Sequence, residues 1–250
     1  MRIIIFSFLL FTISTSAQST DPAPEYKPTI LVIPYLPAMH LSDADQDIAE
    51  ESGMDIGEVR ERFRTGIVQK LNQRFVEVYD ARVPDEGFVS KSDKDFDMIY
   101  HSIAFEQDST SPMKDPAKFA VVDTTIKGKK TKKKDIDKTY INGNVRDPQL
   151  LPDFAKKYNA DYFILLNEFD IKTHFDDCID LALKIYRRDL KIHYTIYNKR
   201  GQQIYGDVAV VHFASNNNNV KQIVDENFPK IADYVFNSLK ASREEVKSKK

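Results

Sequence analysis

The residues with the clearest capacity for chemistry lie between positions 174 and 178. His174, Asp176, Asp177 and Cys178 place an imidazole, two carboxylates and a thiol close together in the sequence. Each of these groups can ligate a metal such as zinc. A metal site usually needs a second ligand pair at a recognisable spacing, and the sequence shows none. We therefore expect a solvated loop here, with a metal site as the alternative.

Two further pairs could act as acids, bases or ligands. Glu168 and Asp170 alternate on one face after an apolar run, and paired carboxylates serve in glycoside hydrolysis. Two acids at the end of a strand are common, so this signal is weak. His193 and His212 each lie on a predicted strand of one hairpin, where we expect them to face each other as a surface pair, not as ligands.

Three aspartates, Asp43, Asp45 and Asp47, have the spacing that opens a calcium-binding loop. The turn glycine of such a loop is replaced by Ile48, and its twelfth position is Met54 instead of glutamate. Carboxylates also stabilise the amino-terminal end of a helix. We expect these three to cap a short helix.

Motifs with a specific catalytic meaning are absent from the sequence, which contains no GxGxxG, Walker, GxSxG, HExxH or CxxC pattern. Ser111 and Lys114 have the S-x-x-K spacing of penicillin-recognising enzymes, but Pro112 and Pro116 disfavour the helix which that chemistry requires. Cys178, the only cysteine, is expected to be a buried or neutral thiol and not a nucleophile. The sequence therefore assigns no catalytic, cofactor-binding or metal-binding residue and predicts no cofactor.

The first half of the chain predicts a strand, a helix and a second strand. Residues 29–36 form an apolar, β-rich run, and a short helix follows Ser42 and ends at Gly53. A long helix is predicted over residues 55–74, where Gly66 would allow close approach to a sheet, and a second strand over residues 76–81. The apolar stripe of the long helix consists of Ile56, Val59, Phe63, Ile67, Leu71 and Phe75.

Regular patterns return after Pro148. A helix is predicted to stop at Asn159, and the apolar strand 162–166 continues as an alternating segment to Ile171. Residues 190–197 and 204–213 then alternate on either side of a turn and predict a β-hairpin. A final helix follows, which we expect Pro229 to kink or divide.

The first 17 residues predict a signal peptide. Arg2 precedes an apolar run over residues 3–13, and small residues end at Ala17. The run is shorter than the roughly 20 residues of a spanning helix. No cysteine lies near Ala17, so we expect a periplasmic or secreted protein without a lipid anchor and without a transmembrane segment after cleavage.

The remaining chain divides by composition. Residues 18–27 predict a flexible linker, residues 28–240 a single α/β domain, and residues 241–250 a charged tail. The domain carries a polar insertion at about residues 83–146, which includes a basic loop from Lys127 to Lys134. That loop could contact an anionic surface weakly. The net charge of −2 does not favour a nucleic-acid partner.

Three segments resemble a known family. Residues 27–36 (KPTILVIPYL) resemble its opening strand, residues 154–166 (FAKKYNADYFILL) its helix and following strand, and residues 190–206 (LKIHYTIYNKRGQQIYG) its hairpin. The family is the anticodon-binding-like periplasmic domain of the TolB amino-terminal domain, CsgG and LpoB. The resemblance implies an α/β (α+β) fold, with a mixed β-sheet and flanking helices, and a role in envelope assembly.

The expected function is that of an exported, non-enzymatic envelope protein, which binds partner proteins or self-assembles in secretion, cell-wall or envelope-assembly machinery. Two alternatives stay open. One is an envelope polymer hydrolase that uses Glu168, Asp170 or the cluster at His174. The other is a periplasmic protein that binds a small ligand in a cavity lined by some of the 12 tyrosines and 16 phenylalanines.

Overall fold

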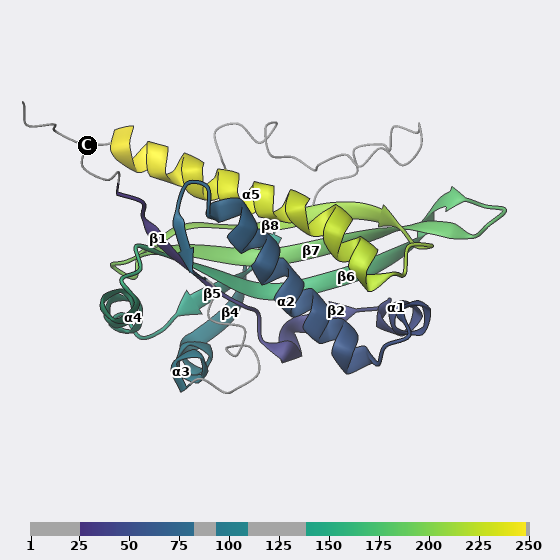
Figure 1. Cartoon of the computed structure of the whole chain (residues 1–250), viewed down its shortest axis with the longest axis horizontal. Coiled ribbons are helices and arrows are strands. Elements are labelled where there is room, and N and C mark those ends of the chain that lie inside the picture. The colour runs from purple at the N-terminus through teal and green to yellow at the C-terminus, as the bar shows by residue number, and fades with distance from the viewer. Residues whose placement is uncertain (1–25, 83–93, 110–138, 249–250) are drawn as a thin grey trace, which may run out of the picture.

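The computed structural model describes residues 26–82, 94–109 and 139–248. Its centre is a mixed six-stranded sheet with helices on both faces, which confirms the predicted α/β class (Figure 1). The strand order is β3 (Asp80–Arg82), β1 (Thr29–Ile33), β6 (Tyr162–Asp180), β7 (Ile185–Asn198) and β8 (Gln203–Ala214). The short strand β2 (His40–Ser42) also pairs with β6 and follows the 3-10 helix η1 (Pro37–Met39).

The direction of pairing changes across the sheet. β1 runs parallel to both β3 and β6, whereas β6, β7 and β8 are antiparallel neighbours. All five residues of β1 are buried, because other elements of the fold cover both faces of this part of the sheet. Pro34 follows immediately, and a proline cannot donate to the ladder.

One face of the sheet is covered by α2 (Ile56–Phe75) and α5 (Val220–Ser248), with α1 (Asp45–Ser52) at their side (Figure 1). α2 begins with a capping box, in which the Asp55 carboxylate accepts from the Glu58 amide at 2.8 Å and Glu58 accepts from the Asp55 amide at 3.1 Å. Its predicted apolar stripe is buried from Val59 to Phe75, but Ile56 is 36% exposed.

Gly66 allows a close approach, but to a helix and not to the sheet as expected. A Cβ atom at this position would lie 3.1 Å from Val224 and 3.4 Å from Phe228, both on α5. The two helices therefore pack directly against each other at this point. α5 itself is one helix with Pro229 in its interior, so of the two expected outcomes, a kink or a division, the division does not occur.

The other face is covered near its β1 side by α3 (Lys94–Ser102) and α4 (Leu150–Tyr158). α4 stops where the sequence predicts, because Asn159 takes a left-handed conformation with φ of 52°. Phe96 and Ile99 of α3 pack with Leu151 and Phe154 of α4 in a second core.

A two-stranded sheet of β4 (Ile103–Ser109) and β5 (Thr139–Val145) packs on the same face. Its antiparallel register places Ile103 opposite Val145 and Ser109 opposite Thr139. The described ends of the expected insertion thus supply a helix and a hairpin to the fold. Likewise, α5 extends through most of the expected tail, to Ser248.

Among the described helices, none has the combination of length and hydropathy needed to cross a membrane.

Candidate functional site

The hairpin of β6 and β7 projects beyond the rest of the described molecule (Figure 1). β8 pairs with β7 no further than Arg187, and β2 pairs with β6 only from Phe169 to Ile171. β6 and β7 continue beyond these neighbours through residues 175–186, which we call the arm; at its base, the amide and the carbonyl of Tyr186 still bond to Ser215. The sequence predicts a solvated loop at residues 174–178, and this is wrong: β6 extends to Asp180 through two irregularities in its register.

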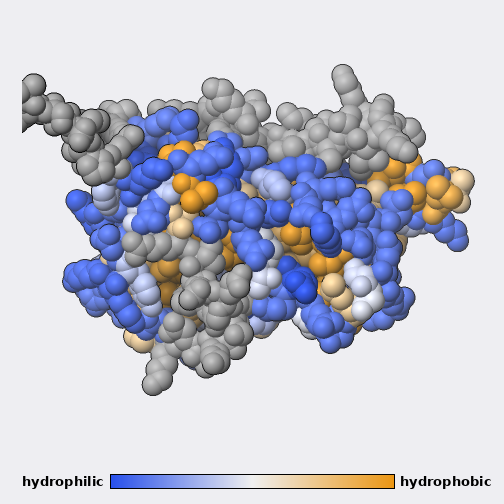
Figure 2. Space-filling view, in the orientation of Figure 1, coloured by the Kyte–Doolittle hydropathy of each residue, from blue (hydrophilic) through white to orange (hydrophobic). Residues whose placement is uncertain are grey.

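The arm carries large apolar side chains in contact with water. Phe175, Leu181 and Leu183 are 72%, 84% and 70% exposed, the three highest values among the large aliphatic side chains and phenylalanines that the structure describes. Figure 2 shows hydrophobic surface at the end of the molecule where Figure 1 shows the β6–β7 hairpin projecting. Contiguous exposed apolar groups of this kind mark sites of interaction.

The tip has a defined turn. The Asp180 carboxylate accepts from the Leu183 amide at 3.1 Å, and Lys184 has a positive φ of 51°. Behind the turn, the rings of Phe175 and Tyr186 meet edge to face at 5.2 Å, and the exposed Cys178 thiol donates to the Ile185 carbonyl at 3.6 Å. The apolar side chains are therefore held by an ordered hairpin.

A polar cluster, which we call the arm-base cluster, lies where the arm leaves the sheet. Asp189 contacts His174 Nε2 at 2.8 Å, His212 Nδ1 at 2.6 Å and Arg187 Nε at 3.0 Å. Arg187 also pairs with Asp177 at 2.5 Å. These five side chains come from β6, β7 and β8, so the cluster ties the three strands together at the root of the arm.

The charge of Asp189 is stabilised by its neighbours. Burial alone would raise the pKa of this carboxyl, but the His212 hydrogen bond and the charges of Arg187 and His174 lower the pKa to about 2. A carboxylate that stays ionised keeps accepting from its three partners. Arg187 is thereby fixed between Asp189 on the sheet and Asp177 on the arm.

The predicted alternative of a metal site at residues 174–178 is not supported by this geometry. His174 faces Asp189, Asp177 faces Arg187, and Cys178 lies exposed on the arm. In the part of the chain that the structure describes, no group of three or more His, Cys, Asp or Glu side chains could hold a metal ion.

His193 and His212 do not face each other, contrary to the sequence prediction. His212 lies opposite Asp189, whereas His193 lies opposite Val208 on β8 and Glu168 on β6. His193 Nδ1 accepts from the Ile141 amide at 3.0 Å, so this ring supports the β4–β5 hairpin. The prediction was wrong because the register of β7 and β8 places the two histidines at different positions along the hairpin.

Glu168 and Asp170 lie on β6, on the same face as His193 and Lys191. Burial raises the pKa of Glu168, and the charge of Asp170 adds to this effect. Burial also raises the pKa of Asp170, an effect that Lys191 and Lys172 partly offset. Two acids with raised pKa values can hold protons for acid–base work, as the hydrolase alternative requires.

The three aspartates near α1 each have a separate partner. Asp43 accepts from the Thr173 amide at 2.9 Å, Asp47 pairs with Arg188 at 2.7 Å, and Asp45 pairs with Arg60 at 2.7 Å. Asp45 and Asp47 do lie in the first turn of α1, but its N-cap is Ala44, which has no side-chain cap. The aspartates therefore connect α1 to the sheet and to α2 more than they cap it.

A buried row of hydrogen-bonded side chains, Tyr35, His40 and Asp45, is not predicted by the sequence patterns. Tyr35 Oη and His40 Nδ1 are 3.2 Å apart, and His40 Nε2 lies 3.1 Å from Asp45 Oδ1. Tyr35 and His40 are 1% and 4% exposed, and His40 stacks on Phe169 at 4.6 Å. The regular five-residue spacing of Tyr35, His40 and Asp45 was the only signal available. Because Tyr35, His40 and Asp45 are buried, we infer that these three side chains serve packing.

Two sequence candidates lie outside the described residues. These are the S-x-x-K match at Ser111 and Lys114 and the basic loop from Lys127 to Lys134.

No protein-family model matches this chain, and no curated protein matches it either.

Proposed function

We propose that this protein is an exported, non-enzymatic protein of the cell envelope that binds a partner protein, or a second copy of itself, through the arm. The observation that carries this proposal is the exposure of Phe175, Leu181 and Leu183 on an ordered hairpin. An apolar side chain of this size, buried on binding, contributes roughly 1.5–3 kcal/mol.

The form of the arm supports a contact with protein. The edges of a strand present unpaired amide and carbonyl groups to any neighbouring chain. Among the described residues, residues 175–185 of the arm have no neighbouring strand outside the β6–β7 pair, and the backbone of Tyr186 at its base bonds to Ser215. Exposed apolar side chains and available strand edges together favour a partner that adds backbone hydrogen bonds as well as buried area.

The family resemblance supports the same conclusion from an independent source. Its three segments form β1, α4 with the start of β6, and the body of the β7–β8 hairpin. These elements make up the centre of the domain and not the arm. The resemblance therefore suggests an envelope-assembly domain, and the arm is the feature that would select the partner of this chain.

The proposal is tested by comparing two variants of the exported protein. Leu181→Ser combined with Leu183→Ser removes apolar surface from the arm. Leu41→Ser makes the same chemical change at a leucine that is 50% exposed on β2. Each protein is examined by size-exclusion chromatography for self-association and by affinity capture from an extract of the organism's envelope.

We expect the wild type and Leu41→Ser to self-associate or to capture the same specific partner, and the double arm variant to lose this binding by at least tenfold. The proposal fails if the wild type is a monomer that captures no specific partner. It also fails if the arm variant binds as well as Leu41→Ser does.

The hydrolase remains a second candidate because Glu168 and Asp170 lie on one face of β6, Glu168 Oε1 lies 3.7 Å from His193 Nε2, and the pKa values of both acids are raised. Under this alternative, the protein releases soluble sugars from purified envelope polysaccharide, and Glu168→Gln lowers the rate by roughly 10²–10⁴-fold. Release of sugars by the wild type and not by this variant would favour the hydrolase over the binding protein.

A further inference from the structure

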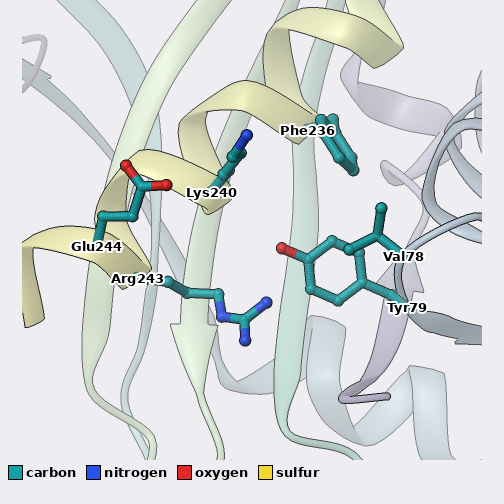
Figure 3. A pocket seen from close by; sticks show the side chains of 6 residues that line it. All are labelled: Val78, Tyr79, Phe236, Lys240, Arg243 and Glu244. Carbon is teal, nitrogen blue, oxygen red and sulfur yellow. The ribbon is translucent and has the colours of Figure 1, made fainter. Parts of the chain in front are cut away.

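A small pocket lies beside the carboxyl-terminal half of α5, at the opposite end of the sheet from the arm (Figure 1, Figure 3). Its volume is about 220 Å³, and it is lined by Val78, Tyr79, Phe236, Lys240, Arg243 and Glu244. This volume is below the roughly 300–1,000 Å³ of pockets that hold drug-sized ligands. Any occupant must therefore be smaller.

The pocket has an aromatic side. The rings of Tyr79 and Phe236 meet edge to face at 5.9 Å, and both rings also contact Phe75. Tyr79 and Phe236 are buried, and Val78 is 47% exposed at the rim. The Arg74 guanidinium already lies 3.7 Å from the centroid of the Phe236 ring, so this side offers an apolar group contact with the remaining ring surface and with Val78.

Two cations border the pocket without an acidic partner in the described part of the chain. Neither Lys240 nor Arg243 lies within 4.0 Å of a carboxylate there. Other cations of the same helical layer do: Lys70 and Lys221 pair with Asp225, and Arg74 pairs with Asp233. The lining of the pocket therefore carries two cations that form no ion pair among the described residues.

Arg243 is held in place by neutral aromatic groups. Its guanidinium lies 5.2 Å from the ring centroid of Tyr79 and 5.7 Å from that of Tyr162. Burial lowers the pKa of Arg243, but the interactions with Tyr79 and Tyr162 raise the pKa above its usual value. The guanidinium therefore keeps its positive charge beside the two rings.

From this arrangement we infer that the pocket binds a small carboxylate that carries an apolar group. The apolar group contacts Tyr79 and Phe236, and the carboxylate accepts hydrogen bonds from Arg243 and Lys240. A guanidinium matches a planar carboxylate through two parallel hydrogen bonds.

A monoanion fits better than a phosphate. Glu244 also borders the pocket, and Figure 3 shows its carboxylate on the same side as Lys240 and Arg243. Its negative charge reduces the net charge available to a ligand from two to one. A doubly charged phosphate would also leave the aromatic side without a partner.

The test is a titration of the isotope-labelled protein followed by nuclear magnetic resonance. Phenylacetate is the probe, phenylacetamide is its uncharged counterpart, and inorganic phosphate is the anion without an apolar group. We expect phenylacetate to shift the signals of Val78, Tyr79 and Phe236 saturably. Phenylacetamide and phosphate are each expected to bind at least tenfold more weakly.

Three variants locate the binding site. Arg243→Gln and Lys240→Gln should each weaken phenylacetate binding by about tenfold. Lys221→Gln makes the same change on the same helix at a lysine paired with Asp225, and it should leave binding unchanged. Lys240 is exposed, so its variant tests the site even if Arg243→Gln unfolds the protein.

The inference is overturned if phenylacetate causes no saturable shift, or if phenylacetamide or phosphate binds as tightly. It is equally overturned if Lys240→Gln and Lys221→Gln bind phenylacetate alike. The arm takes no part in this experiment, so its outcome is independent of the proposed protein-binding function.

Discussion

At the scale of single residues, Asp189 lies at the centre of the contacts that connect the arm to the sheet. One carboxylate accepts from two histidines and an arginine, and the same arginine reaches Asp177 on the arm. Because the partners come from three strands, the loss of one charge would loosen several contacts together. A buried charge that loses its partner is costly, so the arm should be sensitive to this position.

Asp189→Asn tests this role. The pKa of Asp189 in the folded protein is about 2, against about 3.9 for an ordinary aspartate. A lowered pKa stabilises the folded state above the ordinary value, and this stability is lost as the pH falls from about 4 toward 2. We expect the free energy of unfolding of the variant, measured in urea at pH 7, to be about 2 kcal/mol lower than that of the wild type. This difference should become smaller as the pH falls.

Asp225→Asn is the matched control. The pKa of Asp225 is also lowered to about 2, by hydrogen bonds from Lys221 and Lys70, but this carboxylate lies at the surface. Solvent screens exposed ion pairs, so we expect a much smaller loss that shrinks further in salt. Equal losses in the two variants would contradict the role assigned to the arm-base cluster.

Residue types could be recognised from the sequence more easily than their partners. His174 and Asp177 stood out as polar and close in sequence, but their partners, Asp189 and Arg187, lie on the next strand. Which residues meet across a hairpin depends on register, and irregularities in the ladder shift it. The spacing of His174 and Asp177 shows none of this.

At the scale of elements, the β4–β5 hairpin docks by its edge. The amides of Ile141, Gly143 and Val145 donate to His193 Nδ1, Thr195 Oγ1 and Tyr197 Oη at 3.0, 3.1 and 3.4 Å. Alternate residues of β5 thus use alternate side chains of β7 in place of a partner strand. This arrangement satisfies an edge that would otherwise be open to other chains.

Thr195→Val should release this edge. The Thr195 hydroxyl, which is fully buried, accepts from Gly143 and Asn167 and donates to Asn142 at 2.7 Å. Valine has nearly the same shape but no hydroxyl, so these groups would lose a partner. We expect a loss of about 2 kcal/mol and faster hydrogen exchange at the amides of residues 141, 143 and 145.

Thr139→Val provides the comparison for that experiment. Among the described residues, its hydroxyl accepts from the exposed Gln107 side-chain amide at 3.1 Å, in the same hairpin. Exchange at residues 141 to 145 should stay at the wild-type rate. If both valine variants exchange alike, β7 does not hold the edge of β5.

The regular elements were predicted best where one face is buried. The stripe of α2 and the stop of α4 at Asn159 follow local rules of periodicity and capping. The arm was missed because residues 175–180 lack alternation and owe their strand conformation to pairing with β7. Gly66 was assigned to the wrong neighbour because its spacing shows a close approach but not which element approaches.

At the scale of the whole molecule, two cores share the same central strands. On β1, Ile30 and Val32 belong to the core under α2 and α5, whereas Leu31 and Ile33 belong to the core under α3 and α4. β6 divides its side chains in the same way, with Ile164 on one side and Phe163 on the other. Neither core can be lost without exposing strands that the other core needs. We therefore expect the described domain to unfold as a unit.

Phe154→Ala tests this coupling from the smaller core. Phe154 is 6% exposed on α4, and truncation of a buried phenylalanine costs about 3–5 kcal/mol. If the cores unfold together, the unfolding curves followed by helical circular dichroism and by tyrosine fluorescence should have coincident midpoints. Both signals should then report the same loss in the free energy of unfolding. Phe175→Ala, the same change at a 72% exposed arm residue, should leave the midpoint near that of the wild type.

Separate midpoints for the two signals in Phe154→Ala would show that the cores unfold independently. A large loss in Phe175→Ala would show that the arm belongs to the fold and is not a free contact surface.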